Sequence, residues 1–227
     1  MKLFLCGGGS NKQIVFALRK FNSVLKKDKP ILYIPLAMEK ENYKNCKKWF
    51  SKEIKYIGVN SFEMVTSSKE LSKKDLNSYC ALFIGGGNTY KLLNELTEND
   101  NLERIQKYLN NNGVIFGGSA GAIIFGKSIN TCLIDDGNDV NLKNCCGFNY
   151  LNGFSILCHL NKSNFKRNYN YLKEYSKNNK ILYLPEEDVI FINNNKINFI
   201  GTNKYAKFIN GECFIHNCAN FKKDINN

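Results

Sequence analysis

The sequence contains only two histidines among its 227 residues, and it lacks any long apolar run. The run at the amino end, residues 3–6, is followed at once by three glycines and is far too short for a signal peptide or a membrane span. These absences argue against a secreted precursor and against an integral membrane protein. We therefore expect a cytoplasmic protein without a membrane partner.

Cysteine pairs of the C-x-x-C type are also absent, although the chain has nine cysteines. An odd number of scattered cysteines, several of them inside apolar segments, is typical of reduced and buried thiols rather than of disulfides. Two separated histidines and these cysteines give no spacing suited to a zinc site. We expect no metal and no other cofactor.

The net charge of +12 has no matching basic stripe interleaved with aromatic side chains. Lysine and asparagine are frequent along the whole chain, which indicates a general bias in residue usage. We therefore expect no nucleic-acid partner, and the sequence assigns no function to the charge.

Apolar runs that alternate with helical patterns indicate the fold class. Because these runs are continuous rather than alternating, they are typical of strands buried on both faces of a parallel sheet. They lie at residues 3–6, 31–34, 81–84, 113–116, 154–157 and 181–184, and a further strand is expected at 62–65. Helical spacing is seen near 12–26, 39–52, 68–77, 89–96, 101–109 and 165–175. We expect an α/β three-layer sandwich with a mainly parallel central sheet, as a single domain over residues 1–227.

Four short strand-like segments close the chain, at residues 188–192, 196–200, 205–208 and 212–215. We expect these hairpins to pair in antiparallel fashion at one edge of the same sheet.

Glycine-rich loops follow three of the expected strands, at residues 7–9, 85–87 and 117–118. In open α/β sheets, ligands bind outside the carboxyl ends of the strands, so these loops predict a site there. A phosphate cradle is the competing interpretation, but neither of the first two loops continues as G-x-G-x-x-G, and we expect no P-loop of the Gly-Lys-Ser/Thr type.

Ser119 lies in the third loop, within Gly117-Gly118-Ser119-Ala120-Gly121, between an expected strand and an expected helix. Flanking glycines allow the strained turn that raises a serine hydroxyl above a sheet, and the following helix offers its first amides to an oxyanion. This arrangement predicts that Ser119 is a nucleophile.

A nucleophilic serine needs a base, and histidine is the usual one near neutral pH. His159 follows an apolar strand and is expected at the same rim as Ser119, whereas His216 lies in a late hairpin. We expect His159 to be the base. For the acid that orients it, the sequence offers Glu186 and its neighbours Glu187 and Asp188, and a second acidic pair, Asp135-Asp136.

Taken together, the motifs resemble the peptidase E family, serine peptidases of the S51 group that include aspartyl dipeptidase. They are Gly85-Gly86-Gly87-Asn88-Thr89, Gly118-Ser119-Ala120-Gly121-Ala122, a later histidine, and Leu184-Pro185-Glu186. The resemblance covers about residues 1 to 210. It implies a flavodoxin-like fold of the class I glutamine amidotransferase type, with serine in place of the nucleophilic cysteine.

The resemblance also implies roles for single residues. It makes Ser119 the nucleophile, His159 the base and Glu186 the acid. The amides of Gly87 and Ala120 would form the oxyanion hole. Asn88 would shape that loop and the substrate site.

The sequence departs from the aspartyl dipeptidases around the histidine. Their Asn-Pro-His-Phe stretch is replaced by Leu157-Cys158-His159-Leu160, and the segment from His159 to Glu186 is shorter. An N-terminal aspartate would need a cation, and Arg167 is the best-placed one, although it is equally well explained as a solvated residue at a helix start.

We therefore expect a serine exopeptidase that hydrolyses short peptides, and the sequence leaves open whether it is a monomer or a homodimer. Two alternatives are a non-peptidase serine hydrolase on the same fold and a catalytically silent amidotransferase-like binding module.

Overall fold

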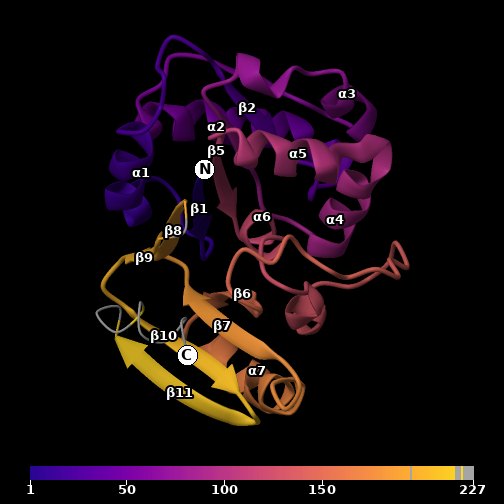
Figure 1. The fold of residues 1–227 in the computed structure, drawn as a ribbon, viewed down its shortest axis with the longest axis vertical. Coiled ribbons are helices and arrows are strands. Elements are labelled where there is room, and N and C mark those ends of the chain that lie inside the picture. Colours follow the sequence, from indigo (N-terminus) through magenta and orange to yellow (C-terminus); the bar gives the residue numbers. More distant parts are fainter. Residues whose placement is uncertain (195, 218–220, 222–227) are drawn as a thin grey trace.

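The computed structural model describes residues 1–194, 196–217 and 221, and it contains two β-sheets with helices packed around them (Figure 1). The strands are β1 (Lys2–Cys6), β2 (Ile31–Ile34), β3 (Phe62–Met64), β4 (Ala81–Ile84), β5 (Val114–Gly118), β6 (Phe154–Leu160), β7 (Lys180–Pro185), β8 (Val189–Asn193), β9 (Lys196–Ile200), β10 (Lys204–Ile209) and β11 (Glu212–Asn217). The helices are α1 (Val15–Asn22), α2 (Tyr43–Ile57), α3 (Ser68–Ser72), α4 (Thr89–Thr97), α5 (Asn101–Asn110), α6 (Ala120–Ile123) and α7 (Lys162–Tyr175). Short 3₁₀ turns lie at Asn11–Ile14, Lys40–Asn42, Leu76–Ser78, Glu98–Asp100 and Asn130–Ile134.

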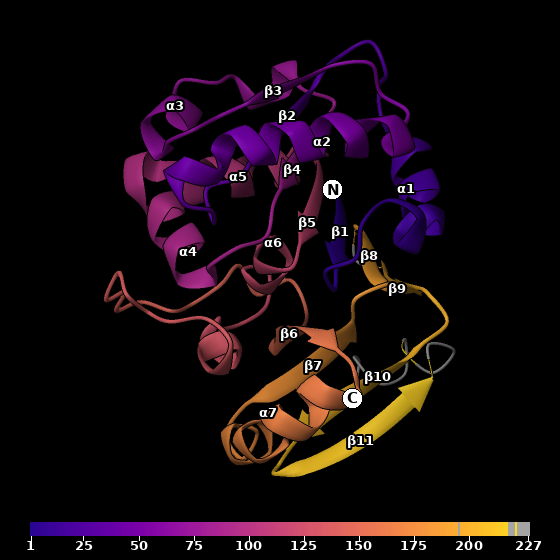
Figure 2. The same cartoon turned by 180° about the vertical axis from the view of Figure 1, so that it is seen from behind.

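The larger sheet has the strand order β3-β2-β4-β5-β1-β8-β9. Its first five strands run parallel, and β8 and β9 complete it in antiparallel fashion. Helices α4 and α5 cover one face (Figure 1), and α1 and α2 cover the other (Figure 2). Helices on both faces explain why β1, β2, β4 and β5 carry continuous apolar runs, and they confirm the expected α/β sandwich with a mainly parallel sheet.

The smaller sheet, with the order β11-β10-β7-β6, differs from the sequence expectation. Only the hairpin of β8 and β9 joins the edge of the larger sheet, whereas β10 pairs with β7 and β11 pairs with β10. Strands β6 and β7 are parallel and are connected by α7. The expectation was wrong here because an apolar run shows that a strand is buried, but not which sheet it joins.

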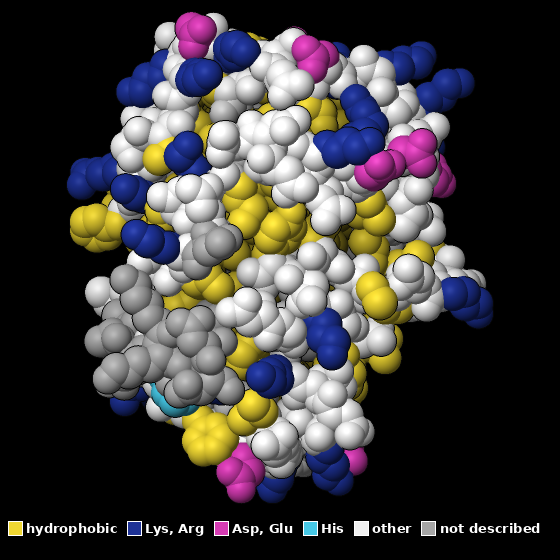
Figure 3. All heavy atoms as spheres, in the orientation of Figure 1, with side chains coloured by type: hydrophobic (Ala, Val, Ile, Leu, Met, Phe, Trp, Pro, Cys, Tyr) yellow, Lys and Arg dark blue, Asp and Glu magenta, His cyan; other side chains and the backbone are white. Residues whose placement is uncertain are grey.

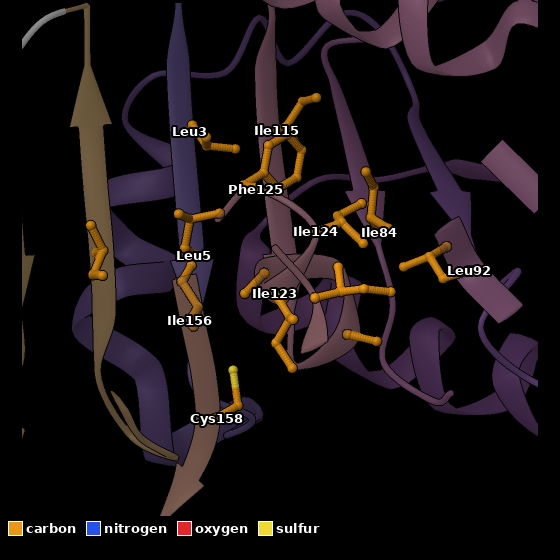
Figure 4. Close-up of a cluster of buried hydrophobic side chains, with 14 of the residues drawn as sticks. Leu3, Leu5, Ile84, Leu92, Ile115, Ile123, Ile124, Phe125, Ile156 and Cys158 are labelled. Atoms are coloured by element: carbon orange, nitrogen blue, oxygen red, sulfur yellow. The ribbon is translucent and has the colours of Figure 1, made fainter. Parts of the chain in front are cut away.

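An apolar core joins the two sheets around α6. In Figure 4, Leu3 of β1 and Ile115 of β5 lie beside Phe125, which follows α6, and Leu5 of β1 lies between this group and Ile156 of β6, from the second sheet. All five side chains belong to one buried cluster and are almost inaccessible to solvent. This packing holds the carboxyl end of β6 against the carboxyl ends of β1 and β5, which positions the site described below.

The structure also shows where the cysteines and the charged side chains lie. The eight described cysteines are free, and most are buried, while Cys218 lies outside the described residues. No helix in the described part of the chain is both long and apolar enough to span a membrane. On the face in Figure 3, Lys and Arg side chains are scattered, most of them near the margin, and hydrophobic side chains gather across the middle.

Candidate functional site

Ser119 occupies a strained turn between β5 and α6. Its φ of 52° and ψ of −112° lie outside the regions that a serine normally adopts. Its amide donates a hydrogen bond to the carbonyl of Cys6 at 3.1 Å, and its carbonyl accepts from the amides of Ala122 and Ile123. These bonds hold the strained residue in place, which is the structural context expected of a nucleophile elbow.

Two glycines allow the turn to pack closely. A Cβ at Gly117 would lie 2.1 Å from the carbonyl oxygen of Gly121, and one at Gly121 would lie 2.2 Å from the carbonyl oxygen of Ile84. At Gly118, by contrast, no atom lies within 4 Å of the Cβ position. The turn therefore needs glycine on its inner side, and it leaves open space next to Ser119.

The imidazole of His159 lies between Ser119 and Glu186. Nε2 of His159 is 2.7 Å from Oγ of Ser119, and Nδ1 is 3.1 Å from Oε1 of Glu186. The side chains of His159 and Glu186 are 39 % and 45 % exposed, so the acid end of this chain of contacts is open to solvent. The structure thus brings together the three residues that the sequence proposed as nucleophile, base and acid.

The backbone turns sharply at His159 inside β6. The pairing of β6 with β7 shifts between Leu157 and Leu160, and His159 has a φ of 63°. Its amide donates to the carbonyl of Gly7 at 2.9 Å, and its carbonyl accepts from Nδ2 of Asn164 at 2.9 Å. This irregularity explains how a residue within a strand directs its ring toward Ser119.

The other acidic candidates from the sequence have different partners. Glu187 is exposed, and Asp188 is buried, where it accepts a hydrogen bond from Asn203 at 3.1 Å. Asp136 accepts from the amide of Thr89 at 2.9 Å and from its hydroxyl at 2.6 Å. Among these candidates, Glu186 is the one that the structure places against His159.

Asp135 and His216, the second histidine of the chain, also have partners other than Ser119. Asp135 pairs with Arg167 on α7. His216 lies on β11, the outer strand of the smaller sheet, with its ring stacked 5.5 Å from that of Tyr205. Neither is a partner of Ser119 in the structure.

The loop after β4 lies beside the Ser119 turn. A Cβ at Gly86 would be 3.1 Å from Cβ of Ser119. Gly87 has a φ of +133°, and a Cβ there would be 2.5 Å from the carbonyl oxygen of Ala37. Within the described part of the chain, the amides of Gly87 and Ala120 donate to no backbone carbonyl, so both remain available for a ligand.

Asn88 fixes the end of this loop. Its Oδ1 caps α4 by accepting from the amide of Lys91 at 2.9 Å, and its Nδ2 donates to the carbonyl of Gly137 at 2.8 Å. The side chain therefore ties the loop after β4 to residues 135–137, which agrees with a role in shaping the loop.

Arg167 contacts Asp135 and Asn168 rather than Ser119, His159 or Glu186. Its guanidinium pairs with Asp135 and donates through Nε to Oδ1 of Asn168 at 3.0 Å, while its side chain is 56 % exposed. Asp135 therefore already neutralises the positive charge with which Arg167 would bind the aspartate side chain of a substrate.

Two thiols lie close to the Ser119 turn and could compete with its hydroxyl. Burial raises the pKa of Cys6 to about 12, and it raises the pKa of Cys158 well above its ordinary value. Because the thiolate is the reactive form of cysteine, both groups are poor nucleophiles near neutral pH.

Residues 121–128, Gly-Ala-Ile-Ile-Phe-Gly-Lys-Ser, match the G-x-x-x-x-G-K-[S/T] pattern of phosphate-binding loops, which the expectation from the sequence overlooked. Such a loop binds phosphate through free backbone amides, but here the amides from Ala122 to Lys127 all donate to backbone carbonyls. The segment is also buried from Ala120 to Gly126. Its structure excludes a phosphate cradle at this position.

Metal ligands do not gather at this site. In residues 1–194, 196–217 and 221, no group of three or more His, Cys, Asp or Glu side chains is arranged to hold a metal ion.

Solved structures of two other proteins share this architecture. A putative peptidase E protein from Listeria monocytogenes EGD-e is 26 % identical in sequence, with a TM-score of 0.74 over 89 % of this chain and 98 % of that one. A peptidase from an acI-B1 actinobacterium, 17 % identical, has a TM-score of 0.71 over 95 % of this chain and 93 % of that one, and it supports the fold alone.

Curated relatives named peptidase E match parts of the chain. The Haemophilus influenzae (strain PittGG) protein is 31 % identical over 104 residues, which are 45 % of this chain and 43 % of the relative. The Actinobacillus pleuropneumoniae serotype 5b protein is 29 % identical over 129 residues, 56 % of this chain and 52 % of the relative. The matches thus span about half the length of these relatives. The model of peptidase family S51 matches residues 3–200, nearly the whole chain, and the protein therefore belongs to peptidase family S51.

Proposed function

We propose that the protein is a serine exopeptidase that hydrolyses short peptides through an acyl-enzyme. The observation that carries this proposal is the 2.7 Å contact between Oγ of Ser119 and Nε2 of His159, with Glu186 on the other ring nitrogen. Membership of family S51 supports peptide hydrolysis as the reaction.

Glu186 sets the tautomer of His159 in this mechanism. A carboxylate beside Nδ1 accepts a hydrogen bond from it, which leaves Nε2 unprotonated and able to take the proton of Ser119. As the serine oxygen bonds to the scissile carbonyl carbon, that proton moves to Nε2. Glu186 then faces an imidazolium and stabilises its positive charge.

The amides of Gly87 and Ala120 stabilise the negative oxygen that forms in this step. Ala120 is the first residue of α6, so its amide points out of the helix end, and Gly87 supplies an amide from the neighbouring loop. When the carbon–nitrogen bond breaks, protonated His159 gives its proton to the leaving amine. Water activated by the same nitrogen then releases the acyl group and restores Ser119.

The test is the substitution Ser119→Ala, with hydrolysis of a dipeptide panel that includes Asp-X as the readout. Loss of the nucleophile should lower kcat by about 10⁶-fold, while the thermal midpoint stays close to that of the wild type. Ser163→Ala, at an exposed serine on α7, is the matched control and should keep full activity. Dipeptide hydrolysis retained by Ser119→Ala would contradict the mechanism.

The preference for an N-terminal aspartate is a separate prediction that follows from the resemblance. If Arg167 binds the aspartate side chain, Arg167→Met should raise KM for Asp-X and leave KM for other dipeptides unchanged. Equal effects on all substrates would show that Arg167 has no such role.

Two alternative functions make different predictions for the same assays. A non-peptidase serine hydrolase would cleave simple esters or amides but none of the dipeptides. A silent binding module would show no labelling of Ser119 by a fluorophosphonate, because labelling requires an activated hydroxyl.

A further inference from the structure

An apolar pocket opens next to Ser119, between α2 and the carboxyl ends of β2 and β4. It measures about 280 Å³ and is lined by Tyr33, Met38, Asn42, Asn45, Cys46, Trp49 and Gly86. We refer to these seven residues as the Trp49 pocket. Sites for drug-sized ligands span about 300–1,000 Å³, so this pocket has room for a smaller group such as one amino-acid side chain.

The pocket reaches the reacting atoms through Gly86. A Cβ placed on Gly86 would be 3.7 Å from Oγ of Ser119 and 3.1 Å from its Cβ, so this glycine touches both the pocket and the serine. The adjoining Gly85 lies against the ring of Tyr33, at 3.3 Å from the position of its Cβ. The part of the pocket wall that Gly86 forms therefore borders the Ser119 turn.

His159 lies on the other side of Ser119. Its ring packs against Gly8 in the loop after β1, whereas Gly86 belongs to the loop after β4. In the larger sheet, β5 lies between β4 and β1. The Trp49 pocket and His159 therefore flank the serine from opposite sides.

This arrangement separates the two halves of a peptide substrate. The leaving amine must lie next to His159, because it receives its proton from Nε2. The acyl half then extends away from His159, toward Gly86 and the pocket. In a dipeptide, the acyl half is the N-terminal residue.

The chemistry of the walls favours an uncharged, apolar side chain. Tyr33 and Cys46 are 3 % and 7 % exposed, and the indole of Trp49 lies 6.1 Å from the ring of Tyr33. No charged side chain among the described residues lines the pocket, and Lys91, on the helix that follows the Gly85–Gly87 loop, is paired with Glu39 at 2.7 Å. A carboxylate placed there would lose water without gaining a cation.

We propose that the Trp49 pocket binds an apolar side chain of the N-terminal residue of the substrate, and that Trp49 and its neighbours determine this specificity. The inference rests on the proposed serine peptidase function and deepens it. It predicts a preference different from the aspartyl one that the family resemblance suggests.

The first test compares kcat/KM of the wild-type enzyme for Phe-Leu, Leu-Leu, Ala-Leu and Asp-Leu, which share one leaving residue. Phe-Leu or Leu-Leu should exceed both Ala-Leu and Asp-Leu by about tenfold or more. Equal values, or the highest value for Asp-Leu, would overturn the proposal.

The second test changes the pocket itself. Trp49→Ala should lower kcat/KM for Phe-Leu about tenfold relative to Ala-Leu. Tyr56→Ala, which removes another exposed aromatic ring from the same helix, should leave that ratio unchanged. An unchanged ratio in Trp49→Ala would contradict the assignment.

A third variant covers the case in which Trp49→Ala fails to fold. Asn45 is exposed at the pocket, so Asn45→Arg should be tolerated and should raise kcat/KM for Asp-Leu relative to Phe-Leu. No change in this ratio would also count against the pocket.

Failure of this inference differs from failure of the proposed function. A wild-type protein that hydrolyses none of the panel and is not labelled by a fluorophosphonate would contradict both. Labelling of Ser119 without any hydrolysis would overturn the substrate assignment, and hydrolysis without apolar preference would overturn the pocket alone.

Discussion

The imidazole of His159 occupies the space that a side chain at Gly8 would need. A Cβ at Gly8 would lie 2.3 Å from Cε1 and 2.5 Å from Nδ1 of that ring, and Gly8 has a φ of +130°. The glycine loop after β1 therefore makes room for the ring of the proposed base.

Gly8→Ala should displace the His159 ring and lower kcat. A shift of about 1 Å in a reacting group can cost about 10²-fold, and we expect a loss of at least that size. Gly153→Ala is the control, because Gly153 also has a positive φ, of +85°, but no atom lies within 4 Å of its Cβ position. If both variants lose activity equally, backbone strain rather than the contact with His159 is the cause.

Glu186→Gln should lower kcat by between about 10² and 10⁴-fold with little change in KM. An amide can donate to Nδ1, which would place the ring proton on Nε2 and prevent it from accepting the serine proton. Glu187→Gln, at the exposed neighbouring carboxylate, should keep wild-type kinetics. The opposite pattern, with Glu187 sensitive and Glu186 tolerant, would reassign the acid.

Asp136→Ala should destabilise the fold more than Asp135→Ala. Asp136 accepts two hydrogen bonds from Thr89, which is fully buried, at 2.9 and 2.6 Å, whereas Asp135 pairs with the half-exposed Arg167 and accepts one longer hydrogen bond, of 3.3 Å, from Asn168. Hydrogen bonds to a charged group contribute about 1.5–3 kcal/mol each, and exposed ion pairs about 0–1 kcal/mol. Urea unfolding of the two variants measures the difference, and equal losses would contradict it.

The stability of the protein should depend on pH through Asp188. Burial raises the pKa of this carboxyl above its ordinary value of 3.8, and Oδ2 has no hydrogen-bond partner among the described residues. The folded state therefore binds the proton more tightly than the unfolded state. The contribution of Asp188 to the free energy of unfolding should therefore fall as pH rises from 3.8 through the raised pKa and then level off.

Asp188→Asn removes this titration. The thermal midpoint of the variant minus that of the wild type should therefore increase from about pH 4 upward. A difference that stays constant with pH would show that Asp188 ionises normally in the folded protein.

The sequence predicted the larger sheet well because its signals are local. Strands β1, β2, β4 and β5 carry continuous apolar runs, and the glycines at the carboxyl ends of β1, β4 and β5 permit close contacts that other residues would block. The pairing of β10 with β7 could not be predicted in the same way, since partner choice among short apolar strands depends on contacts distant in the sequence.

For the candidate site too, the sequence predicted the features that depend on neighbouring residues but not those that depend on tertiary packing. The turn at Ser119 and the position of His159 after an apolar run were readable in the sequence. The choice of Glu186 over Glu187 was not, because it depends on the direction of the chain after Pro185. The Trp49 pocket was also missed, since Met38 and Trp49 meet only when α2 packs against the sheet.

The proposed catalytic residues come from two different sheets. Ser119 follows β5 of the larger sheet, whereas His159 lies in β6 and Glu186 follows β7 of the smaller one. A small rotation of one sheet against the other would separate Oγ of Ser119 from Nε2 of His159 while leaving every strand intact. During gradual denaturation, catalysis should therefore disappear before circular dichroism registers any loss of secondary structure.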